Sequence, residues 1–504
     1  MNRLLLLAPS GALPILASPV IIRTAMVYLV ICGGIAIWAS RRTRTAGDFF
    51  VAGPGIGLWP LAIAAMAATL SGFAFIGGPG LVYTVGAGAL FIVLPASLTA
   101  SLSAWTLGTR MRLLGEVRGL MTVPEAVGAR YRSRTVQGLA AVALLVATVG
   151  YLATNLLALG VSIVTLFQTG LPRGILIGTA VVVSYSAAGG ILAGIYTDLF
   201  QGAVMALAST LVFAAALASG GGLSGISATI LAHDPALLGP WGRFPPLAAL
   251  SFFFVFALGT LGQPHVIHKY YMLRDPQQLR WYPLLMTGAL LIGLLLYFGV
   301  GVAIKAAVLR GDVPPLVNAD DATPTFLLRY TSPWLAGLVF SGVAAAIMST
   351  VNSFFSVGAA AVTRDIPMAL GWRCRNELLV GRLATLALAV VSASLALGSG
   401  LLVALLGVFG WGLFASTLVP ALAIGLNWPG ATRKGAIASI ATGLVATLTF
   451  ETLAWAKFYT FPAGVTVSGL ALVLSLLVFF GVSWVTRRDA EGDLDPDVRV
   501  IIES

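Results

Sequence analysis

The chain has 504 residues, of which 58% are hydrophobic and only 9% are charged, with a formal net charge of +11. Its mean hydropathy is +0.97. Soluble domains carry charge on about a quarter of their residues, so this composition excludes a soluble globular protein and indicates a multi-pass membrane protein. Two distant cysteines, Cys32 and Cys374, and three histidines argue against a disulfide framework, a metal cluster or haem chemistry.

Thirteen apolar segments are long enough to span a bilayer. Their predicted limits are 20–40, 56–78, 84–108, 142–168, 173–192, 195–219, 246–264, 282–305, 332–358, 378–398, 401–426, 434–456 and 464–486. The residues before them, 1–19, form an N-terminal extension that is either signal-peptide-like or the product of an upstream start site. The residues after them, 487–504, form a short acidic tail.

The distribution of Lys and Arg predicts the orientation. With the N-terminus outside, most of the 29 Lys and Arg residues fall in inner loops or in the tail, as the positive-inside rule requires. We therefore expect a bacterial-type inner (plasma) membrane protein with a cytoplasmic C-terminus. The net positive charge is explained by this topology, and nucleic-acid binding is not expected.

Two of the segments contain glycine and proline at matching places. The segment 56–78 ends in SGF (71–73) and GGPG (77–80), and the segment 246–264 contains GT (259–260) and runs into GQPH (262–265). Such interruptions, five segments apart, favour an inverted-repeat transporter with two broken helices, although glycine and proline can also merely kink a membrane helix.

The predicted organisation follows from these breaks. We expect an N-terminal extension (1–19), an extra first helix and inner loop (20–55), a first five-helix repeat (56–219), an external loop (220–245), a second five-helix repeat (246–426), two C-terminal helices (427–486) and a cytoplasmic tail (487–504).

A row of polar side chains lies in the segment 332–358. Ser349, Asn352 and Ser353 are spaced i, i+3, i+4 and share one helix face, and Thr350 is next to them. Neutral oxygens at low dielectric suit a small alkali cation and not zinc or iron. Packing between membrane helices, where small and hydroxyl residues are common, is the alternative interpretation.

Five further strings, in order, resemble the sodium/solute symporter family, which includes sodium/proline, pantothenate, monocarboxylate and sugar carriers. They are AGDFFVAG (46–53), TVPE (122–125), GG with YTDLFQ (189–190 and 196–201), GQPH (262–265) and AIMST (346–350). The resemblance implies an all-α leucine-transporter fold of 5+5 helices, with one extra helix before this core and two after it. It implies sodium as the coupling ion, no organic cofactor and no enzymatic activity.

The resemblance also implies a sodium site. Its ligands would be the backbone carbonyls of Ala67, Leu70 and Ala346 and the hydroxyls of Ser349 and Thr350. Free carbonyls at an opened helix, together with two hydroxyls, fit the chemistry expected for sodium.

Asp198 is one of few acidic residues near membrane depth, where such groups are usually functional. Together with Asn352 and Ser353, it would hold a second sodium or line the inner exit path, as a matching acid does in some relatives. A helix N-cap is the alternative. The chain also departs from sodium/proline carriers at Thr69, where those carriers have an aspartate.

The substrate is predicted from the side chains near the two breaks. We expect no Arg or Lys at mid-membrane depth, so a substrate carboxylate would rest on helix N-terminal N–H groups. The candidate substrate-binding residues are Ser71, Phe73, Phe256, Thr260, Gln263 and Trp411. These few polar groups favour a small, partly apolar solute, such as proline or another small amino acid, or a monocarboxylate.

These observations predict a sodium-coupled secondary symporter that works by alternating access, in a lipid bilayer, as a functional monomer. A proton-coupled transporter of the same fold and a carrier of pantothenate or another organic acid are the alternatives. A passive channel is less consistent with two broken helices.

Overall fold

The computed structural model describes residues 18–41, 55–462 and 464–503. The predicted extension, apart from its last two residues, and the string at 46–53 lie outside the described residues. Eleven helices in the described part are long and apolar enough to cross a membrane, and two shorter apolar helices, Leu58–Thr69 and Leu171–Ser184, accompany them.

The first half of the chain forms α1 (Pro19–Ser40), α3 (Leu58–Thr69), α4 (Gly78–Val85), α5 (Leu90–Ser103), α6 (Thr109–Arg118), α7 (Val123–Arg130), α8 (Arg134–Phe167) and α9 (Leu171–Ser219). The second half forms α10 (Gly222–His233), α11 (Pro246–Gly259), α12 (Pro264–Ile267), α13 (Tyr282–Leu309), α14 (Ala322–Tyr330), α15 (Pro333–Ala360), α16 (Ile366–Ala369), α17 (Glu377–Ser399), α18 (Val403–Leu418), α19 (Arg433–Trp455), α20 (Val467–Val485), α21 (Ala490–Asp493) and α22 (Pro496–Glu503).

Helix α9 differs from the prediction. The sequence predicted a boundary between 192 and 195, but the structure continues one helix of 49 residues through this region. Glycines such as those at 189 and 190 do not end a helix where no water competes for its backbone. Since 49 residues extend about 74 Å, more than twice the roughly 30 Å hydrocarbon core, α9 is too long to be one straight span.

Both predicted helix breaks are present. After α3, Leu70 adopts an extended conformation with φ −78° and ψ 105°, and a π-helical turn, η1 (Phe73–Gly77), leads into α4. After the short turn η5 (Thr260–Gly262) that follows α11, Gln263 adopts φ −78° and ψ 100°, and α12 begins at Pro264. Proline at the first helical position forces the preceding residue out of helical geometry, which explains the second break.

The first break depends on glycine. A Cβ at Gly72 would lie 2.6 Å from Ala158 Cβ on α8 and 3.0 Å from Ile347 Cγ1 on α15. The opened backbone therefore packs directly between these two helices, and only a residue without a side chain allows this approach.

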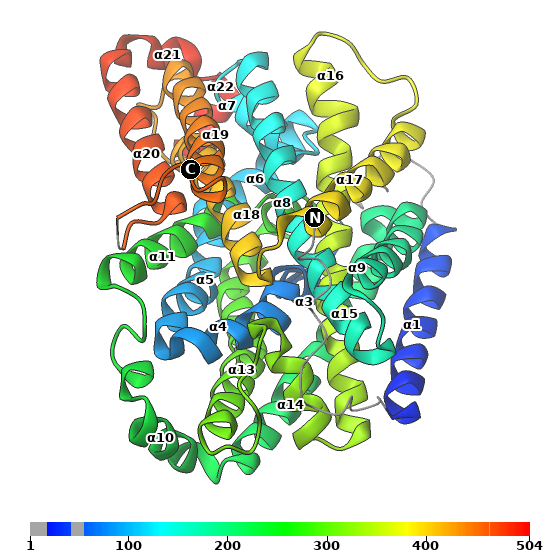
Figure 1. The fold of residues 1–504 in the computed structure, drawn as a ribbon. Coiled ribbons are helices and arrows are strands. Elements are labelled where there is room, and N and C mark those ends of the chain that lie inside the picture. Colours follow the sequence, from blue (N-terminus) through cyan, green and yellow to red (C-terminus); the bar gives the residue numbers. More distant parts are fainter. Residues whose placement is uncertain (1–17, 42–54, 463, 504) are drawn as a thin grey trace.

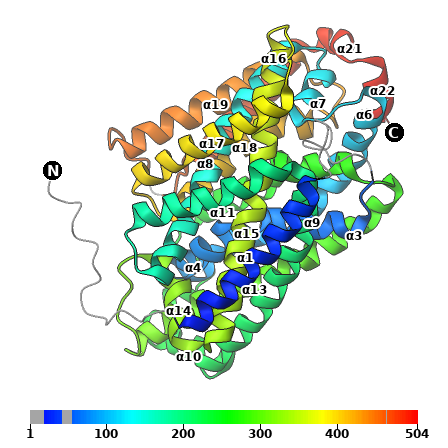
Figure 2. The same ribbon diagram turned by 90° about the vertical axis from the view of Figure 1, so that its right-hand side faces the viewer.

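The helices outside the predicted repeats lie on opposite edges of the molecule (Figures 1 and 2). Helix α1 packs against α9 and α15 on one edge, and the paired α19 and α20 pack against α18 on the other. The broken helix α3–α4 lies between these edges, in contact with α8, α9, α13 and α15. This arrangement places both breaks in the interior.

Candidate cation and substrate sites

The first break meets α15 at Thr350. The Thr350 hydroxyl donates a hydrogen bond to the carbonyl of Ala68 at 2.9 Å and lies 3.5 Å from that of Leu70. The neighbouring Ser349 hydroxyl is buried and has no hydrogen-bond partner among the described residues. A buried polar atom without a partner requires an explanation, and a bound ion at this place would provide one.

The other predicted sodium ligands belong to the same two helices. Ala67 on α3 and Ala346 on α15 are fully buried, and α3 packs against α15. The five predicted residues therefore lie on facing helices at the break. They offer neutral oxygens, which suit an alkali cation.

Helix α8 holds the opened backbone in place. The Gly72 N–H donates to Asn155 Oδ1 at 2.9 Å, and the Ser71 hydroxyl lies 3.2 Å from the Tyr151 hydroxyl. Asn155 is oriented by its own bond to the Tyr151 carbonyl, 2.9 Å away. The break is thus fixed by side chains from α8.

Asp198 lies inside α9, far from the start of that helix at Leu171, so its interpretation as an N-cap is wrong. Its carboxylate is buried and accepts a hydrogen bond from Lys269 Nζ at 3.1 Å, and each side chain is only 1% exposed. Lys269 follows the predicted segment 246–264, and the predicted orientation places it in an inner loop together with Arg274 and Arg280. The structure instead buries it against an acidic partner 71 residues away.

The predicted companions of Asp198 come from α15. Ser349 faces the Asp198 carboxylate, but neither Ser349 Oγ nor Asp198 Oδ1 makes a hydrogen bond with the described residues. A Cβ at Gly194 would clash with Asn352 Nδ2, so the Asn352 amide lies against α9 one turn before Asp198. Ser353 is buried on the same helix.

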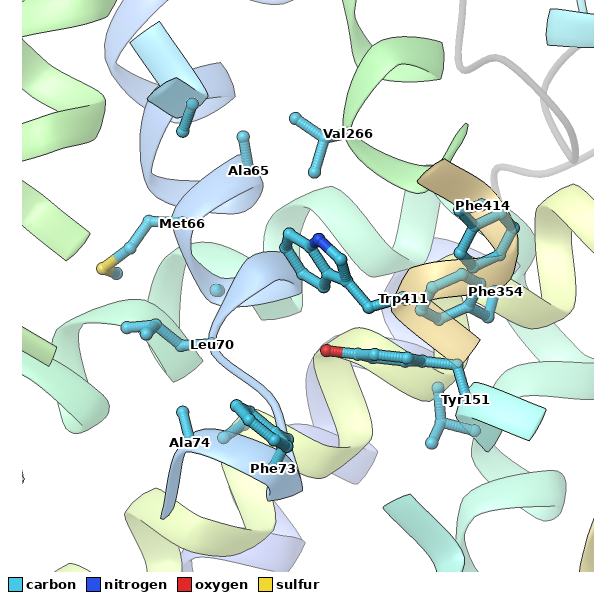
Figure 3. Packing of buried hydrophobic residues seen from close by; sticks show 14 of the residues in the cluster. Ala65, Met66, Leu70, Phe73, Ala74, Tyr151, Val266, Phe354, Trp411 and Phe414 are labelled. Atoms are coloured by element: carbon cyan, nitrogen blue, oxygen red, sulfur yellow. The ribbon is translucent and has the colours of Figure 1, made fainter. Parts of the chain in front are cut away.

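An aromatic cavity of about 40 Å³ lies beside the first break, between α5, α8, α11, α13 and α18. Phe256 stacks on Trp411 with centroids 5.1 Å apart and on Phe73 at 6.0 Å. Tyr151 and Tyr297 complete the wall. Figure 3 shows the Tyr151 hydroxyl directed toward the chain between Leu70 and Phe73, with the Trp411 ring next to it.

Two polar atoms of this wall are buried without a partner, Trp411 Nε1 and the Tyr297 hydroxyl. An indole N–H and a phenol O–H usually find a partner when buried. Trp411 Nε1 lies against Gly259 of α11, where an added Cβ would be 2.3 Å away, so it can bond to a substrate only when the side chains of the wall separate.

The predicted substrate residues divide into two groups. Phe73, Phe256 and Trp411 line the cavity, whereas Ser71, Thr260 and Gln263 do not. Thr260 bonds to the Phe256 carbonyl and to Thr99, each at 2.9 Å, and Gln263 bonds back to the Gly259 carbonyl at 3.3 Å.

Tyr151 and Tyr297 also line the cavity and were not among the predicted substrate residues. Each tyrosine lies inside a long apolar helix, and its hydroxyl was the one available signal, because a buried Tyr hydroxyl usually has a partner.

Hydrogen bonds join separate segments of the chain on either side of the breaks. At one end, Ile56 N donates to Met272 O at 3.0 Å and Arg274 N donates to Ile56 O at 2.9 Å, which ties the start of α3 to the chain after α12. At the other end, Val403 N at the start of α18 donates to Asp320 Oδ2 at 2.9 Å. Burial raises the pKa of Asp320 to about 6, against the effect of this hydrogen bond.

Two broken helices beside an aromatic cavity are the arrangement of the leucine-transporter fold. The chain superimposes on a substrate-bound Na+-coupled sialic acid symporter with a TM-score of 0.77 at 16% identity, over 94% of this chain and 98% of that one. It superimposes on a nucleobase-cation-symport-1 family transporter with a TM-score of 0.54 at 15% identity, over 90% and 98% of the two chains. At these identities, the matches show the fold.

The sequence comparisons show the family. The model of the sodium:solute symporter family matches residues 49–443, so the chain belongs to that family. It is 28% identical to the osmoregulated proline transporter OpuE of Bacillus subtilis (strain 168), over 92% of this chain and 95% of OpuE. It is 26% identical to the sodium/pantothenate symporter of Escherichia coli (strain K12), over 91% and 95%, and 25% identical to the sodium/proline symporter of that strain, over 95% and 97%.

Proposed function

We propose that this protein is a sodium-coupled symporter that imports a small amino acid such as proline, or a monocarboxylate, by alternating access. It would act as a monomer, with the N-terminus outside and the C-terminal tail in the cytoplasm. Membership of the sodium:solute symporter family supports the coupling ion, and the excess of basic residues in the predicted inner loops supports the orientation.

The observation that carries the substrate class is the pair of unpartnered donors beside an aromatic stack. Trp411 Nε1 and the Tyr297 hydroxyl can donate to a carboxylate, and the faces of Phe73 and Phe256 can hold an apolar ring or chain. The wall offers few of the polar groups that a sugar needs. The cavity of about 40 Å³ is much smaller than typical ligand pockets of about 300 Å³ or more, so a substrate enters only when these side chains separate.

For sodium, we propose the carbonyls of Ala67, Leu70 and Ala346 and the hydroxyls of Ser349 and Thr350. An ion there would join α3 to α15 and so favour the geometry in which the substrate cavity is complete. The Thr350 hydroxyl, now bonded to the Ala68 carbonyl, and the unpartnered Ser349 hydroxyl support this assignment. Asp198, Asn352 and Ser353 form an adjoining polar group, on the proposed exit path of the ion.

Uptake into proteoliposomes tests the proposal. One sodium ion that crosses about 100 mV provides about 2.3 kcal/mol, and a tenfold gradient adds about 1.4 kcal/mol. Together they can concentrate a neutral solute several hundred-fold. We expect radiolabelled proline to accumulate only with an inward sodium gradient and a negative interior, and equal uptake with choline in place of sodium would refute sodium coupling.

Competition identifies the substrate among the remaining candidates. Unlabelled small amino acids, monocarboxylates and pantothenate are added in turn, each with sodium present. A compound that is transported should also raise the melting temperature of the purified protein by mass action. Uptake driven by a proton gradient in choline would favour the proton-coupled alternative.

A further inference from the structure

The pair formed by Asp198 and Lys269 is unusual in its burial. Among the ion pairs of the described residues, it alone has both side chains only 1% exposed. Asp198 lies in α9, and Lys269 lies in the turn η6 (His268–Met272), directly after α12. A carboxylate in a dry interior requires a compensating charge, and here a side chain of the same protein provides it.

The side chains around Asp198 carry the kinds of oxygen found in cation sites, and the Lys269 ammonium lies where a cation would bind. Lys269 Nζ lies 3.1 Å from Asp198 Oδ2, while Asp198 Oδ1 and the Ser349 hydroxyl have no hydrogen-bond partner. The Asn352 amide lies against α9 one turn before Asp198, and the next residue of α15, Ser353, is buried as well. An acid with three neutral oxygen-bearing side chains is a ligand set that sodium accepts.

We propose that the Lys269 ammonium is a tethered cation that takes the place of a second sodium ion beside Asp198. The proposal rests on the sodium coupling proposed above. The transport cycle then moves one sodium per substrate, through the site at Ser349 and Thr350. A sodium ion added beside Asp198 would put two cations against one buried carboxylate, and their repulsion is strong where water is excluded.

The position of Ser349 links the two cations. Its hydroxyl faces Asp198, and the next residue, Thr350, contacts the carbonyls at the first break. The mobile ion and the fixed ammonium would therefore lie on two sides of one hydroxyl. The fixed charge, the Lys269 ammonium, follows the second break in the sequence, and the mobile sodium ion binds at the first break.

Sodium binding without substrate tests this proposal. Radioactive sodium chloride is titrated into the purified full-length protein, with choline chloride to keep the ionic strength constant, and bound sodium is counted per chain. We expect one sodium for the wild type and for Lys269→Arg. We expect two sodium ions per chain for Lys269→Met, which removes the charge with little change of volume. The amount of bound sodium should then rise about twice as steeply with sodium concentration. Lys434→Met is the matched control, because Lys434 is an exposed lysine that pairs with Asp489, and should bind one.

The outcomes separate this proposal from the proposed function. Two sodium ions on the wild type would overturn the tethered cation and leave sodium coupling intact. No bound sodium, with uptake unaffected by choline, would instead refute the coupling itself. A folded Lys269→Met that still binds one sodium would also overturn the tethered cation.

A loss of folding in Lys269→Met is informative as well. The double variant Asp198→Asn with Lys269→Met removes both charges, and we expect it to fold and to bind one sodium. If Lys269→Met melts at low temperature in choline, sodium should restore its melting temperature. Failure of that rescue, with a stable double variant, would show that sodium cannot replace the ammonium and would contradict the proposal.

Discussion

The two helix breaks have nearly the same backbone and very different surroundings. Leu70 and Gln263 share a φ of −78° and differ by only 5° in ψ. Yet the first break faces the Asn155 amide of α8 and the Thr350 hydroxyl of α15, whereas the second is followed six residues later by the buried ammonium of Lys269. The same local opening of a helix can thus serve a mobile cation or deliver a fixed one, and the side chains around it decide which.

The largest expected effect concerns the fixed charge, the Lys269 ammonium beside Asp198. Asp198→Asn keeps the shape of the side chain but leaves Lys269 buried without its counter-charge, and breaking a buried pair costs about 3–5 kcal/mol. We expect a clear fall in thermal stability, measured in detergent, and a loss of sodium-driven uptake. Recovery of stability in the double variant with Lys269→Met is the control. An Asp198→Asn protein as stable and active as the wild type would mean that the charge of this pair has no role.

The next effect concerns the mobile cation at the first break. Thr350→Val and Ser349→Ala each remove one proposed ligand, and a bond to a charged partner is worth about 1.5–3 kcal/mol. The sodium concentration for half-maximal uptake should rise roughly ten- to a hundredfold, with substrate binding little changed at saturating sodium. Ser341→Ala on the same helix is the control, because its hydroxyl bonds only to the Gly337 carbonyl. Normal sodium dependence in both variants would make these hydroxyls packing groups.

A smaller effect should distinguish substrate binding from sodium binding. Trp411→Phe and Tyr297→Phe keep the aromatic wall and remove the unpartnered donors. We expect about tenfold weaker affinity for proline at saturating sodium, measured from the rise of the melting temperature with proline concentration, with the sodium dependence unchanged. Trp428→Phe is the control, because Trp428 packs on Phe479 and Phe480 away from the cavity. Unchanged affinity in both variants would argue against a carboxylate at these donors.

The smallest expected effect is pH-dependent and concerns the closed end at Asp320. Its pKa is raised from 3.8 to about 6 by burial, so the protonated form favours the folded, closed state. This contribution is fully present below the ordinary pKa of 3.8 and is lost as the pH rises through about 6. Wild-type stability should fall by about 1 kcal/mol more than that of Asp320→Asn between pH 5 and pH 7. If the free energies of unfolding of the two proteins changed equally with pH, the raised pKa of Asp320 would be contradicted.

Much of the fold was predictable because it depends on local composition. At 71–80 and 259–264, glycine and proline occur together and at matching places in the two repeats, so both breaks could be predicted from the sequence. The pairing of Lys269 with Asp198 could not, because it depends on how the chain after α12 packs against α9. In the sequence, Lys269 is also close to Arg274 and Arg280, and this clustering is typical of the basic residues in an inner loop.

Single residues of the cavity were predictable only in part. Phe73 and Phe256 were found because they lie close to the breaks in the sequence, and Trp411 was added as a further apolar wall. Tyr151 and Tyr297 belong to long apolar helices, α8 and α13, that are hydrophobic on nearly every side. No periodic pattern in such helices distinguishes the side that faces a cavity from the side that faces a neighbouring helix.

The bridge between Ile56 and Leu273 is made entirely of main-chain atoms. Alanine scanning therefore leaves this closure intact and would attribute the gating to other residues. Amide hydrogen exchange reads it directly, because the N–H groups of Ile56 and Arg274 become available to deuterium only when the two segments part. The exchange rate of these two amides would thus record how often this end of the transporter opens, whichever solute it carries.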